Sequence, residues 1–570
     1  MNSEAINTWS RFPADFITPP VAERAGIIEV RLGSSAPVPH ILPGDFSSPI
    51  TALEYDSRQA GPGVLYFALP GLHVDGHDYI PDAVSRGARV IVHQKKLAAY
   101  SEGVLYLQVK DSRFAMSPIA DAFYDFPSRR IGVIGVTGTE GKSTTVSLIY
   151  QILKLLGKKT GFISTVQHGD GITENWNSEH QTTPEATAIH RLLAEMCGNG
   201  VELAVLESSS HGLSKRTNRL GDVNFNVGVM TKVTHDHLEF HGTWEQYRSD
   251  KAELFRSLDA FPAKQAAAGA LPLPSFGVAN ADDPSADYFA AATKHKTYTF
   301  STKGSKADLS LRTLESGPDG NRYEVFVDST GATLTVRDQL PGAFNAANVL
   351  ATLLVVSNLL SVKVETLVPL VSQLKPVRGR MTAIQQGQPF EVHVDYAHTP
   401  SSFEAVLPPV RERAALTGKR LITLFGSPGE RDIQKRYLQG EIAARYSDIV
   451  ILTDEDPRGE DPMTILEEIA KGCEAHSGCG PNSGCEADPN CTTTIRSMIR
   501  DETLFLIPDR PQAIRKAFSL AAEGDIVLLL GKGHENSIIY ADKTIDYDEI
   551  KEAETALAEA GYACAGSKEK

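Results

Sequence analysis

The sequence predicts an α/β protein of three domains, in which mostly parallel sheets carry helices on both faces. Apolar runs of strand length alternate with segments of helical spacing along most of the chain. The strongest runs, at 203–206 and 526–530, contain no polar position, which is typical of parallel strands that are covered on both sides. A length of 570 residues allows three or four domains of ordinary size.

Two segments with Pro and basic residues divide the chain. Residues 126–130 form a linker before a strongly apolar run, and residues 374–379 combine Pro and Gly in a hinge-like segment. We therefore expect domains at 1–127, 128–376 and 377–570. In the first domain, a strand at 64–69, a helix at 79–87 and a strand at 90–92 form one α/β unit.

The segment 135–144, Gly-Val-Thr-Gly-Thr-Glu-Gly-Lys-Ser-Thr, is the most specific signal in the chain. It connects an apolar run at 131–136 to a helical stretch at 145–154. Glycines let backbone N–H groups approach an anion, and the helix N-terminus adds partial positive charge. In such loops the lysine, here Lys142, reaches the outer phosphates, and the hydroxyl of Ser143 is offered to Mg²⁺. The segment predicts a nucleotide-phosphate site and a protein that uses ATP or GTP.

The glycine spacing of this loop departs from the commonest phosphate-loop pattern. That pattern has a glycine six positions before the lysine, where this chain has Val136. The alternative interpretation is a glycine-rich turn without a ligand. A Gly-Lys-Ser triplet between a strand and a helix disfavours that alternative.

Polar side chains follow two further apolar runs of the central region. Glu207 and His211 follow the run at 203–206, and His235, Asp236 and His237 follow the run at 226–230. Ligands of open α/β sheets bind at the carboxyl ends of strands. A carboxylate, an imidazole and a loop serine would suit a divalent cation that bridges ATP phosphates. For either cluster taken alone, the alternative is helix capping by Ser or Asp.

The last domain shows the same alternation. Strands are expected at 392–395, 421–425, 449–452 and 526–530, with helices between them. This pattern predicts a second doubly wound, Rossmann-like domain.

The overall charge and the absence of long apolar stretches disfavour several classes of function. Lys and Arg number 56 against 71 Asp and Glu, and the resulting charge of −15 disfavours nonspecific binding to nucleic acid or anionic membranes. The N-terminus lacks the pattern of a signal peptide, and no apolar stretch approaches the roughly 18 residues of a transmembrane helix. We expect a cytoplasmic protein without nucleic-acid or membrane partners, acting as a monomer.

Four of the six cysteines lie six residues apart in one segment: Cys473, Cys479, Cys485 and Cys491. With His476 they are candidate metal ligands, but structural zinc sites usually have about two to four residues between ligands. The surrounding Gly, Pro, Asn and Ser favour a solvated surface insertion.

Taken together, the motifs resemble those of the Mur ligase family over nearly the whole chain. The phosphate loop is similar to that family's Gly-Thr-x-Gly-Lys-[Ser/Thr], which accounts for the glycine spacing. Glu207-Ser-Ser-Ser-His resembles its Glu-x-Ser-Ser-His segment, and Tyr247-Arg-Ser-Asp-Lys251 matches its Tyr-x-x-x-Lys. Further similar segments begin at Asp236, Asn280, Leu340, Asp395, Arg431 and Gly531. Several are weak alone, whereas the set is specific.

The resemblance implies a catalytic set of Lys142, Glu207, His237 and Lys251. Ser143, Glu207 and His237 would hold Mg²⁺. Lys251 would be carbamylated by CO₂, which converts a cation into an anionic oxygen ligand for a second metal ion. Without the resemblance, Lys251 would be expected to be an ordinary lysine on a helix surface. The implied ATP contacts are Gly138, Thr139, Glu140, Gly141, Lys142, Ser143, Thr144, Asn280, Asn345, Asn348, Arg380 and Asp395.

The resemblance also implies a first domain that binds uridine. Asp56-Ser57-Arg58 and the segment 69–76 resemble motifs of that domain. Thr182-Thr183-Pro184 resembles the motif for the phosphate and sugar region of the substrate, with Ser209 nearby. The segment 215–219 is two residues longer than usual, so Arg216 and Arg219 are alternatives for one substrate contact.

The expected pocket for the incoming amino acid includes Glu455-Asp456-Pro457-Arg458, Gly531 and Glu535. The family's segment reads Asp-[Asn/Asp]-Pro-[Arg/Ala], and members that add meso-diaminopimelate usually have Asn before Pro. The extra carboxylate of Asp456 suits a cationic side chain such as lysine or ornithine, whereas Arg458 can pair with a carboxylate. We favour a basic diamino acid, with meso-diaminopimelate as the alternative.

The implied reaction is ATP-dependent addition of the third amino acid to UDP-MurNAc-L-Ala-D-Glu through an acyl phosphate, in peptidoglycan precursor synthesis. One alternative is a related amide ligase, such as a folylpolyglutamate synthetase or another Mur ligase. The other is a nucleotide-binding regulator that retains the fold without turnover. The uridine-type first domain and the Asp-Pro-Arg segment at 456–458 disfavour the related ligases, and the intact catalytic set disfavours the regulator.

Overall fold

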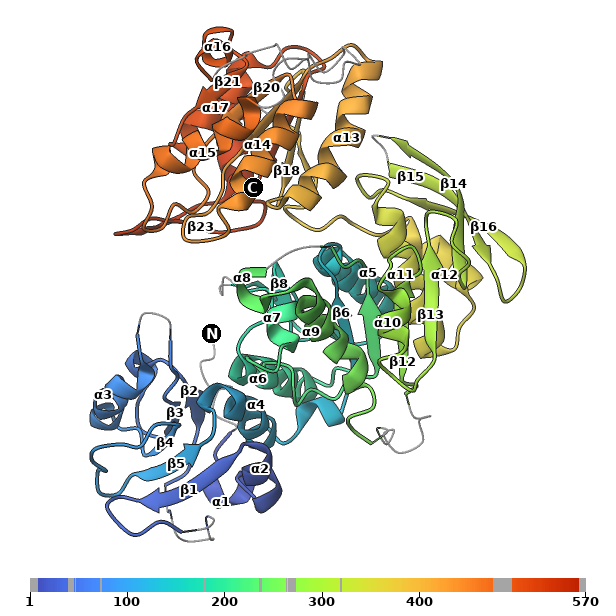
Figure 1. Cartoon of the computed structure of the whole chain (residues 1–570). Helices are drawn as coiled ribbons and strands as arrows, with labels where there is room; N and C mark the ends of the chain where they lie inside the picture. Colours follow the sequence, from blue (N-terminus) through green and yellow to red (C-terminus); the bar gives the residue numbers. More distant parts are fainter. Residues whose placement is uncertain are drawn as a thin grey trace, which may run out of the picture. The chain divides into compact units, whose positions relative to one another are not determined.

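The computed structural model describes residues 9–38, 41, 46, 48–71, 74–177, 181–234, 238–262, 264, 273–317, 320–474 and 495–562. The chain forms two compact units. Unit 1 comprises Met1–Val233, Gly242–Ser310 and Leu350–Val364, and unit 2 comprises Thr234–His241, Leu311–Val349 and Glu365–Lys570. Figure 1 shows the helices and strands of both units.

The first sheet of unit 1 has five strands in the order β1-β5-β4-β3-β2. Only the β1–β5 pair is antiparallel. Alternating residues of β3 enter two separate cores, Leu65 and Phe67 on one face and Tyr66 on the other, because side chains alternate across a strand. The strands are β1 (Ile27–Leu32), β2 (Ala52–Glu54), β3 (Val64–Phe67), β4 (Val90–His93) and β5 (Leu105–Val109). The helices are α1 (Pro13–Phe16), α2 (Pro19–Arg24), α3 (Ile80–Arg86), α4 (Ser112–Phe123), η1 (Ser57–Gln59), η2 (Gly76–Tyr79) and η3 (Pro127–Arg129).

The second sheet of unit 1 runs in the order β14-β13-β12-β11-β6-β10-β7-β8-β9. Its strands are β6 (Gly132–Thr137), β7 (Thr160–Ile163), β8 (Gln167–Gly169), β9 (Glu174–Trp176), β10 (Leu203–Glu207), β11 (Val227–Met230), β12 (Phe276–Asn280), β13 (Thr297–Ser301) and the start of β14 (Leu309–Gly317). The helices are α5 (Lys142–Leu155), α6 (Ala186–Gly198), α7 (Ser210–Leu213), α9 (Trp244–Ser257) and α10 (Ala286–Ala290).

Parallel pairing in this sheet aligns the strand ends that matter for function. Val136 of β6 lies opposite Glu207 of β10, and Thr137 lies opposite Met230 of β11. The segments that follow β6, β10 and β11 therefore leave the sheet at one edge, where ligands of such sheets bind.

In unit 2, the remainder of β14 neighbours β15 (Gly320–Val327), which pairs with β16 (Ala332–Asp338) in antiparallel fashion. Unit 2 also contains α8 (Leu238–His241), which precedes these strands in the chain. After β16 come α11 (Asn345–Leu360), which crosses into unit 1, and α12 (Val364–Val371).

The main sheet of unit 2 has the order β17-β18-β22-β19-β20-β21, with only the β17–β18 pair antiparallel. Separate cores cover its two faces, one with α13, α14 and α15 and one with α17 and α18. The strands are β17 (Thr382–Ile384), β18 (Glu391–Asp395), β19 (Leu421–Phe425), β20 (Ile449–Leu452), β21 (Leu504–Leu506), β22 (Ile526–Leu530), β23 (Ser537–Ile539) and β24 (Thr544–Asp546). The helices are α13 (Pro400–Leu416), α14 (Gln434–Tyr446), α15 (Pro462–Glu474), α16 (Ile495–Arg500), α17 (Arg510–Leu520) and α18 (Glu549–Glu559).

These sheets confirm the predicted α/β class with parallel strands. One local expectation is wrong: Cys473 does not belong to a solvated loop. It is buried in α15, and its Sγ lies 3.4 Å from the carbonyl oxygen of Gly440 as a hydrogen-bond donor. Cys479, Cys485 and Cys491 lie outside the described residues. Within the described ranges, no helix is long and apolar enough to cross a membrane.

Candidate active site

The phosphate loop connects β6 to α5 and is packed against the end of β11. Gly138 has φ +151° and Gly141 has φ +79°, conformations that suit glycine. A Cβ atom at Gly138 would lie 1.9 Å from Thr231 Oγ1. The Thr231 hydroxyl donates to the carbonyl oxygen of Glu140 at 2.5 Å. The loop is therefore held by a neighbouring strand, and only glycine fits at position 138.

Two side chains at the start of α5 carry the expected nucleotide chemistry. Lys142 Nζ donates to the carbonyl oxygen of Thr139 at 2.8 Å, so the amine lies over the loop. The buried hydroxyl of Ser143 donates to Glu207 Oε1 at 2.9 Å. Glu207 Oε2 accepts from the backbone N–H of Thr165 at 2.8 Å.

The Ser143–Glu207 pair fits a magnesium site. Mg²⁺ prefers oxygen ligands and commonly uses one or two carboxylates together with phosphates and water. No cluster of three or more His, Cys, Asp or Glu side chains that could hold a metal occurs among the described residues. A hydroxyl and a carboxylate beside a phosphate loop suit an Mg²⁺ ion that is bound to a nucleotide.

Lys251 lies on the buried side of α9, so the expectation of a surface lysine is wrong. Its side chain is 2% exposed, and Nζ donates to the carbonyl oxygen of Gly138 at 2.6 Å. Nζ also lies 4.5 Å from the centre of the Tyr247 ring. The Tyr247 hydroxyl lies 2.9 Å from Thr139 Oγ1. The Tyr-x-x-x-Lys motif thus contacts the phosphate loop through both of its defining side chains.

Asn280 is joined to the same edge of the sheet, at the end of β12. Its side-chain amide donates to the carbonyl oxygen of Thr231 at 2.9 Å. His237 lies outside the described residues, as do His235 and Asp236.

The predicted substrate residues of unit 1 are tied to the end of β10. Thr183 Oγ1 donates to the carbonyl oxygen of Glu207 at 3.0 Å and accepts from the N–H of Ser209 at 3.0 Å. Ser209 also caps α7, because its hydroxyl accepts from the N–H of Gly212 at 3.1 Å. The capping interpretation is therefore correct for Ser209, whereas Glu207 faces the phosphate loop. Thr182 is half-buried beside this group.

The two candidate arginines differ in their surroundings. Arg219 donates to the carbonyl oxygen of Thr183 and to Glu185 Oε1, both at 2.8 Å. Arg113 shares the same Glu185 oxygen at 2.9 Å. Arg216, by contrast, is exposed. Arg219 stabilises the predicted substrate segment at Thr183 by a hydrogen bond, and Arg216 is accessible on the surface.

Ser57 is buried in η1 of the first sheet. The preceding Asp56 caps this short helix by accepting from the N–H of Arg58 at 2.9 Å.

In unit 2, the predicted ATP residues are held by backbone contacts. The side-chain amide of Asn345 donates to the carbonyl oxygen of Pro341, and that of Asn348 donates to Asn345 Oδ1, both at 2.8 Å. Asp395 ends β18 and accepts from the N–H groups of Met381 and Ala397, both at 2.7 Å. Burial raises the pKa of Asp395. The contact with Met381 fixes the chain directly after Arg380.

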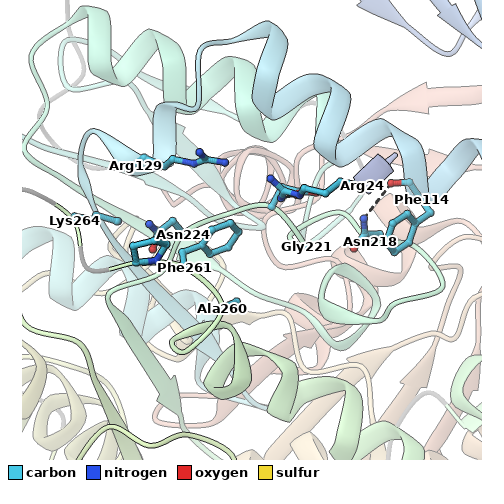
Figure 2. Close-up of a pocket in the computed structure, with 11 residues that line it drawn as sticks. Arg24, Phe114, Arg129, Asn218, Gly221, Asn224, Ala260, Phe261 and Lys264 are labelled. Carbon is cyan, nitrogen blue, oxygen red and sulfur yellow. Dashed lines mark hydrogen bonds and ion pairs between the residues drawn. The ribbon is translucent and has the colours of Figure 1, made fainter. Parts of the chain in front are cut away.

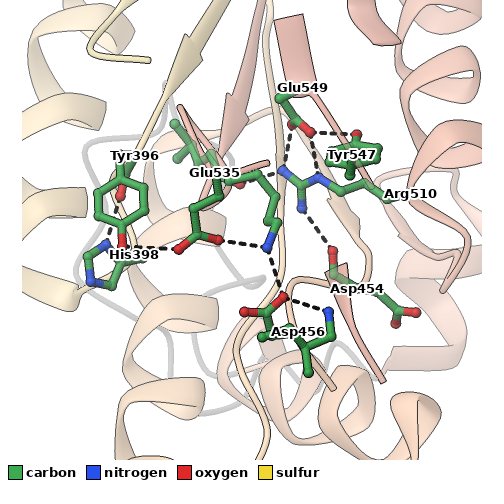
Figure 3. Close-up of polar contacts among 11 residues, drawn as sticks. Tyr396, His398, Asp454, Asp456, Arg510, Glu535, Tyr547 and Glu549 are labelled. Atoms are coloured by element: carbon green, nitrogen blue, oxygen red, sulfur yellow. Dashed lines mark hydrogen bonds and ion pairs between the residues drawn. The ribbon is translucent and has the colours of Figure 1, made fainter. Parts of the chain in front are cut away.

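Figure 3 shows polar contacts of Asp456 and Glu535, two residues of the predicted amino-acid pocket. Their partner is a buried cation that was not assigned from the sequence. Lys532 Nζ donates to Asp456 Oδ1 at 2.8 Å and to Glu535 Oε2 at 2.6 Å. Glu535 Oε1 accepts from the hydroxyl of Tyr396 at 3.2 Å. Burial alone would lower the pKa of Lys532, but the two carboxylates raise it above its ordinary value. The lysine is therefore a permanent charge that offsets part of the acidic pocket.

Glu455 differs from Asp456 because its Oε2 has no hydrogen-bond partner among the described residues. The side chain is buried, and burial raises its pKa to about 7. Gly531, with φ +99°, lies beside it, and a Cβ there would be 3.3 Å from Glu455 Oε2. Arg458 is half-buried with φ +55°, and its N–H donates to the carbonyl oxygen of Ile539 at 2.9 Å.

Comparisons with known proteins decide the family. Three family models match the chain: "Mur ligase family, catalytic domain" at 49–124, "Mur ligase middle domain" at 136–356, and "Mur ligase, glutamate ligase domain" at 379–533. The UDP-N-acetylmuramyl-tripeptide synthetase of Treponema denticola is 46% identical over 533 residues, covering 90% of this chain and 95% of that protein. The chain belongs to the Mur ligase family. It is an ATP-dependent ligase.

Two further proteins similar to this Mur ligase support the assignment. The UDP-N-acetylmuramyl-tripeptide synthetase of Treponema pallidum is 48% identical, covering 89% of this chain and 93% of that protein. A solved structure of a UDP-N-acetylmuramoyl-L-alanyl-D-glutamate–2,6-diaminopimelate ligase has a TM-score of 0.54 and 25% identity. It covers 90% of this chain and 96% of that chain. The N-terminal, central and C-terminal α/β architecture of Mur ligases is thereby confirmed.

In this Mur ligase, hydrogen bonds join many of the predicted residues within each unit. In unit 1 they join Ser143, Glu207, Thr183, Ser209 and Arg219 in one set, and they separately join Lys142 to Thr139, Lys251 to Gly138, and Asn280 to Thr231. In unit 2 they join Asp456, Lys532 and Glu535 in one set and Asn348 to Asn345 in another. The sequence offered one indication that Lys532 is functional, because Gly531-Lys-Gly directly follows the apolar run at 526–530 and ligands bind where such strands end.

Proposed function

We propose that this Mur ligase adds the third amino acid to UDP-MurNAc-L-Ala-D-Glu, with cleavage of ATP to ADP and phosphate. The observation that carries the proposal is the continuous set of contacts from Ser143 through Glu207 to Thr183 and Ser209. It joins the nucleotide motif to the substrate motif at one sheet edge. The names of the Treponema relatives and of the similar solved structure support the same reaction.

The chemistry is proposed to pass through an acyl phosphate. A carboxylate oxygen of the D-glutamate residue attacks the γ-phosphorus of ATP, and ADP leaves. The amine of the incoming amino acid attacks the carbonyl carbon and loses a proton, and phosphate leaves with the electron pair of the C–O bond. The protein forms no covalent bond in these steps, so positioning and neutralisation of charge carry most of the catalysis.

The proposed nucleotide contacts follow from the site geometry. Lys142 and the loop N–H groups of residues 138–144 bind the phosphates, and Asn280 supports the same edge through Thr231. Asp395 holds the backbone around Arg380, whose guanidinium lies 4.8 Å from the centre of the Tyr396 ring. Asn345 and Asn348 are the further proposed contacts.

Mg²⁺ is the proposed metal, held by Ser143 and Glu207, with His237 as a further ligand. When bound, it offsets the negative charge of the phosphates. Lys251 is proposed to be carbamylated, a step in which its neutral amine attacks CO₂ and loses a proton. The position of its Nζ against the phosphate loop supports this role, because a carbamate there would add an anionic oxygen donor.

For the substrate, we propose that Arg216 is the contacting arginine, because it is exposed on the surface. Ser57, Thr182, Thr183 and Ser209 are the remaining proposed contacts to the UDP-dipeptide.

We propose a basic diamino acid, lysine or ornithine, as the amino acid added. The pocket has three carboxyl groups, Glu455, Asp456 and Glu535, against the two cations Lys532 and Arg458. Because burial raises the pKa of Glu455 to about 7, the excess amounts to one negative charge when Glu455 is ionised. A ligand with a second ammonium group would balance this excess. The competing candidate is meso-diaminopimelate, whose extra carboxylate would pair with Arg458.

One parallel assay tests both levels of the proposal. The purified enzyme is given ATP, Mg²⁺ and the UDP-dipeptide with lysine, ornithine or diaminopimelate, and phosphate release and product mass are measured. Turnover is expected with lysine or ornithine. A clear preference for diaminopimelate refutes the amino-acid assignment only, whereas no release with any of the three refutes the proposed addition to the UDP-dipeptide.

The catalytic residues are tested by Lys142→Ala and Lys251→Ala. Both variants are expected to lose turnover, and unchanged turnover in both would refute the mechanism.

The domain limits 1–127, 128–376 and 377–570 remain proposals that limited proteolysis tests. The cytoplasmic location and the monomeric state also remain predictions.

A further inference from the structure

A cavity of about 700 Å³ lies in unit 1, and none of the residues assigned above is among the described residues that line it (Figure 2). Arg24 of α2, Phe114 of α4 and Arg129 of η3 form one side of it. The lining also includes residues of the segment 218–224, together with residues 260–262 and Lys264. Its volume falls in the range of small-molecule sites, and such sites often lie where two substructures meet.

The cavity lies at the opposite edge of the central sheet from the phosphate loop. Lys264 lines it, and its Nζ donates to the carbonyl oxygen of Ile131 at 2.8 Å and to Asn226 Oδ1 at 2.5 Å. Ile131 and Asn226 immediately precede β6 and β11, whereas the phosphate loop follows β6. A strand the length of β6 spans roughly 20 Å, so the cavity is separate from the nucleotide site.

Positive charge in the cavity exceeds negative charge. Among the lining residues that the structure describes, three are cationic and one, Asp222, is acidic; Asp222 forms an ion pair with Arg24. Arg129 lies 3.4 Å from Asp121, but burial raises the pKa of that carboxyl to about 7. Among the described residues, the hydrogen bonds of Lys264 go to neutral oxygens, and burial lowers its pKa to about 7. An anionic ligand would stabilise the charged form of Lys264 and would pair with the guanidinium of Arg129.

Flat apolar surface lies next to these cations. The guanidinium groups of Arg24 and Arg129 lie 5.7 and 5.8 Å from the centre of the Phe261 ring. Phe114 adds a second aromatic side chain, and Asn218 and Asn224 add polar groups to the lining. Few polar groups converging beside apolar walls are typical of a site for an organic ion.

We propose that this cavity is a second ligand site, which binds a small organic phosphate. The phosphate group contacts Arg129 and Lys264, and a flat ring of the ligand packs against Phe261. Arginine and lysine both bind phosphate through charge-assisted hydrogen bonds, and ring stacking adds the contact that inorganic phosphate lacks.

Calorimetric titration with phenyl phosphate, inorganic phosphate and benzoate at constant ionic strength tests the proposal. Phenyl phosphate is expected to bind wild type and Lys142→Ala equally, because Lys142 belongs to the nucleotide site. Affinity should fall about tenfold in Arg129→Gln and in Lys264→Met, since each loses a charge-assisted hydrogen bond. Inorganic phosphate and benzoate should bind more weakly.

The matched control is Arg130→Gln, which removes an exposed neighbouring guanidinium outside the lining and should leave binding unchanged. Circular dichroism confirms folding, and Arg129→Gln decides the outcome if Lys264→Met does not fold. No binding, binding that is lost in Lys142→Ala but retained in Arg129→Gln, or equal affinity for benzoate would each overturn the proposal.

Discussion

Gly138 occupies the position where β6 ends, and its surroundings leave no room for a side chain. Gly138→Ala would place Cβ 1.9 Å from Thr231 Oγ1 and 3.0 Å from the carbonyl oxygen of Lys232. The loop must then move away from β11, which displaces the N–H groups that bind phosphate. We expect turnover to fall about a hundredfold, as sub-ångström to 1 Å misplacements in active sites do. Steady-state kinetics with varied ATP measures the effect.

Gly198→Ala provides the control for that substitution. Gly198 ends α6, and a Cβ there would meet no heavy atom within 4 Å. Full activity is expected, with stability equal or higher by up to about 1 kcal/mol from helix propensity. Full activity in Gly138→Ala as well would show that the loop tolerates the displacement.

Glu455 should make stability depend on pH. Because burial raises its native pKa to about 7 from an ordinary value of 4.5, the native state holds a proton that the unfolded chain has lost in this window. Stability therefore falls as pH rises between these values. Glu455→Gln removes the cost of the buried charge, and we expect it to gain roughly 2 to 3 kcal/mol near pH 8 and little near pH 5.

Urea unfolding at the two pH values, followed through the transition of unit 2, measures this difference. Glu523→Gln, which alters an exposed side chain, should match wild type at both. A gain in Glu455→Gln that is the same at both pH values would assign the effect to packing and not to ionisation.

At the scale of elements, local pattern predicted strands well. The runs at 203–206 and 526–530 became β10 and β22 because continuous apolar residues suit strands covered on both faces. Helix starts were less accurate: α5 begins at Lys142, before the expected 145, because its first turn carries polar loop residues. In that first turn, polar residues occupy positions where the apolar residues that indicate a helix would otherwise recur.

The pairings within the site could not be predicted from local pattern. Lys251 lies in a segment rich in charged residues, which resembles a solvated helix until α9 is packed against the phosphate loop. Lys532 and Asp456 are 76 residues apart. Their contact depends on the sheet order, which places β22 between β18 and β19. No local sequence motif can reveal a contact between residues this far apart in the chain.

Arg510 joins α17 to α18 and to two strand ends, so its loss should destabilise unit 2. Its side chain is fully buried, and Nε and Nη2 donate to Glu549 at 2.8 and 2.6 Å. Nη1 and Nη2 also donate to the carbonyl oxygens of Asp454 and Leu530. Arg510→Met leaves the Glu549 carboxylate buried without its cation. A loss of about 3 to 5 kcal/mol is expected in the unfolding free energy of unit 2.

The double variant Arg510→Met/Glu549→Leu tests the origin of that loss. Removing both charges should recover much of the stability, since the unpaired carboxylate is the main cost. If the double variant is less stable than Arg510→Met, the hydrogen bonds to the strand ends dominate instead.

At the scale of the whole molecule, the predicted nucleotide residues are divided between the two compact units. Lys142 and Asn280 belong to unit 1, and Asn345, Arg380 and Asp395 belong to unit 2. Chains with more than one compact unit often unfold in several steps, so ligands can stabilise the transitions unequally. Thermal unfolding with and without nucleotide therefore reports which unit binds the phosphates.

We predict that a non-hydrolysable ATP analogue with Mg²⁺ stabilises the transition of unit 1, because that unit contains the phosphate loop and the Ser143–Glu207 pair. At a free concentration about a hundred times Kd, the stabilisation should approach about 2.7 kcal/mol. Lys142→Ala should abolish the shift in calorimetry, whereas Lys158→Ala, which removes a surface lysine paired with Glu202, should retain it. An equal shift in Lys142→Ala would place the phosphates elsewhere. Omitting Mg²⁺ should reduce the shift in wild type, because the buried Glu207 carboxylate then faces the nucleotide without an intervening cation.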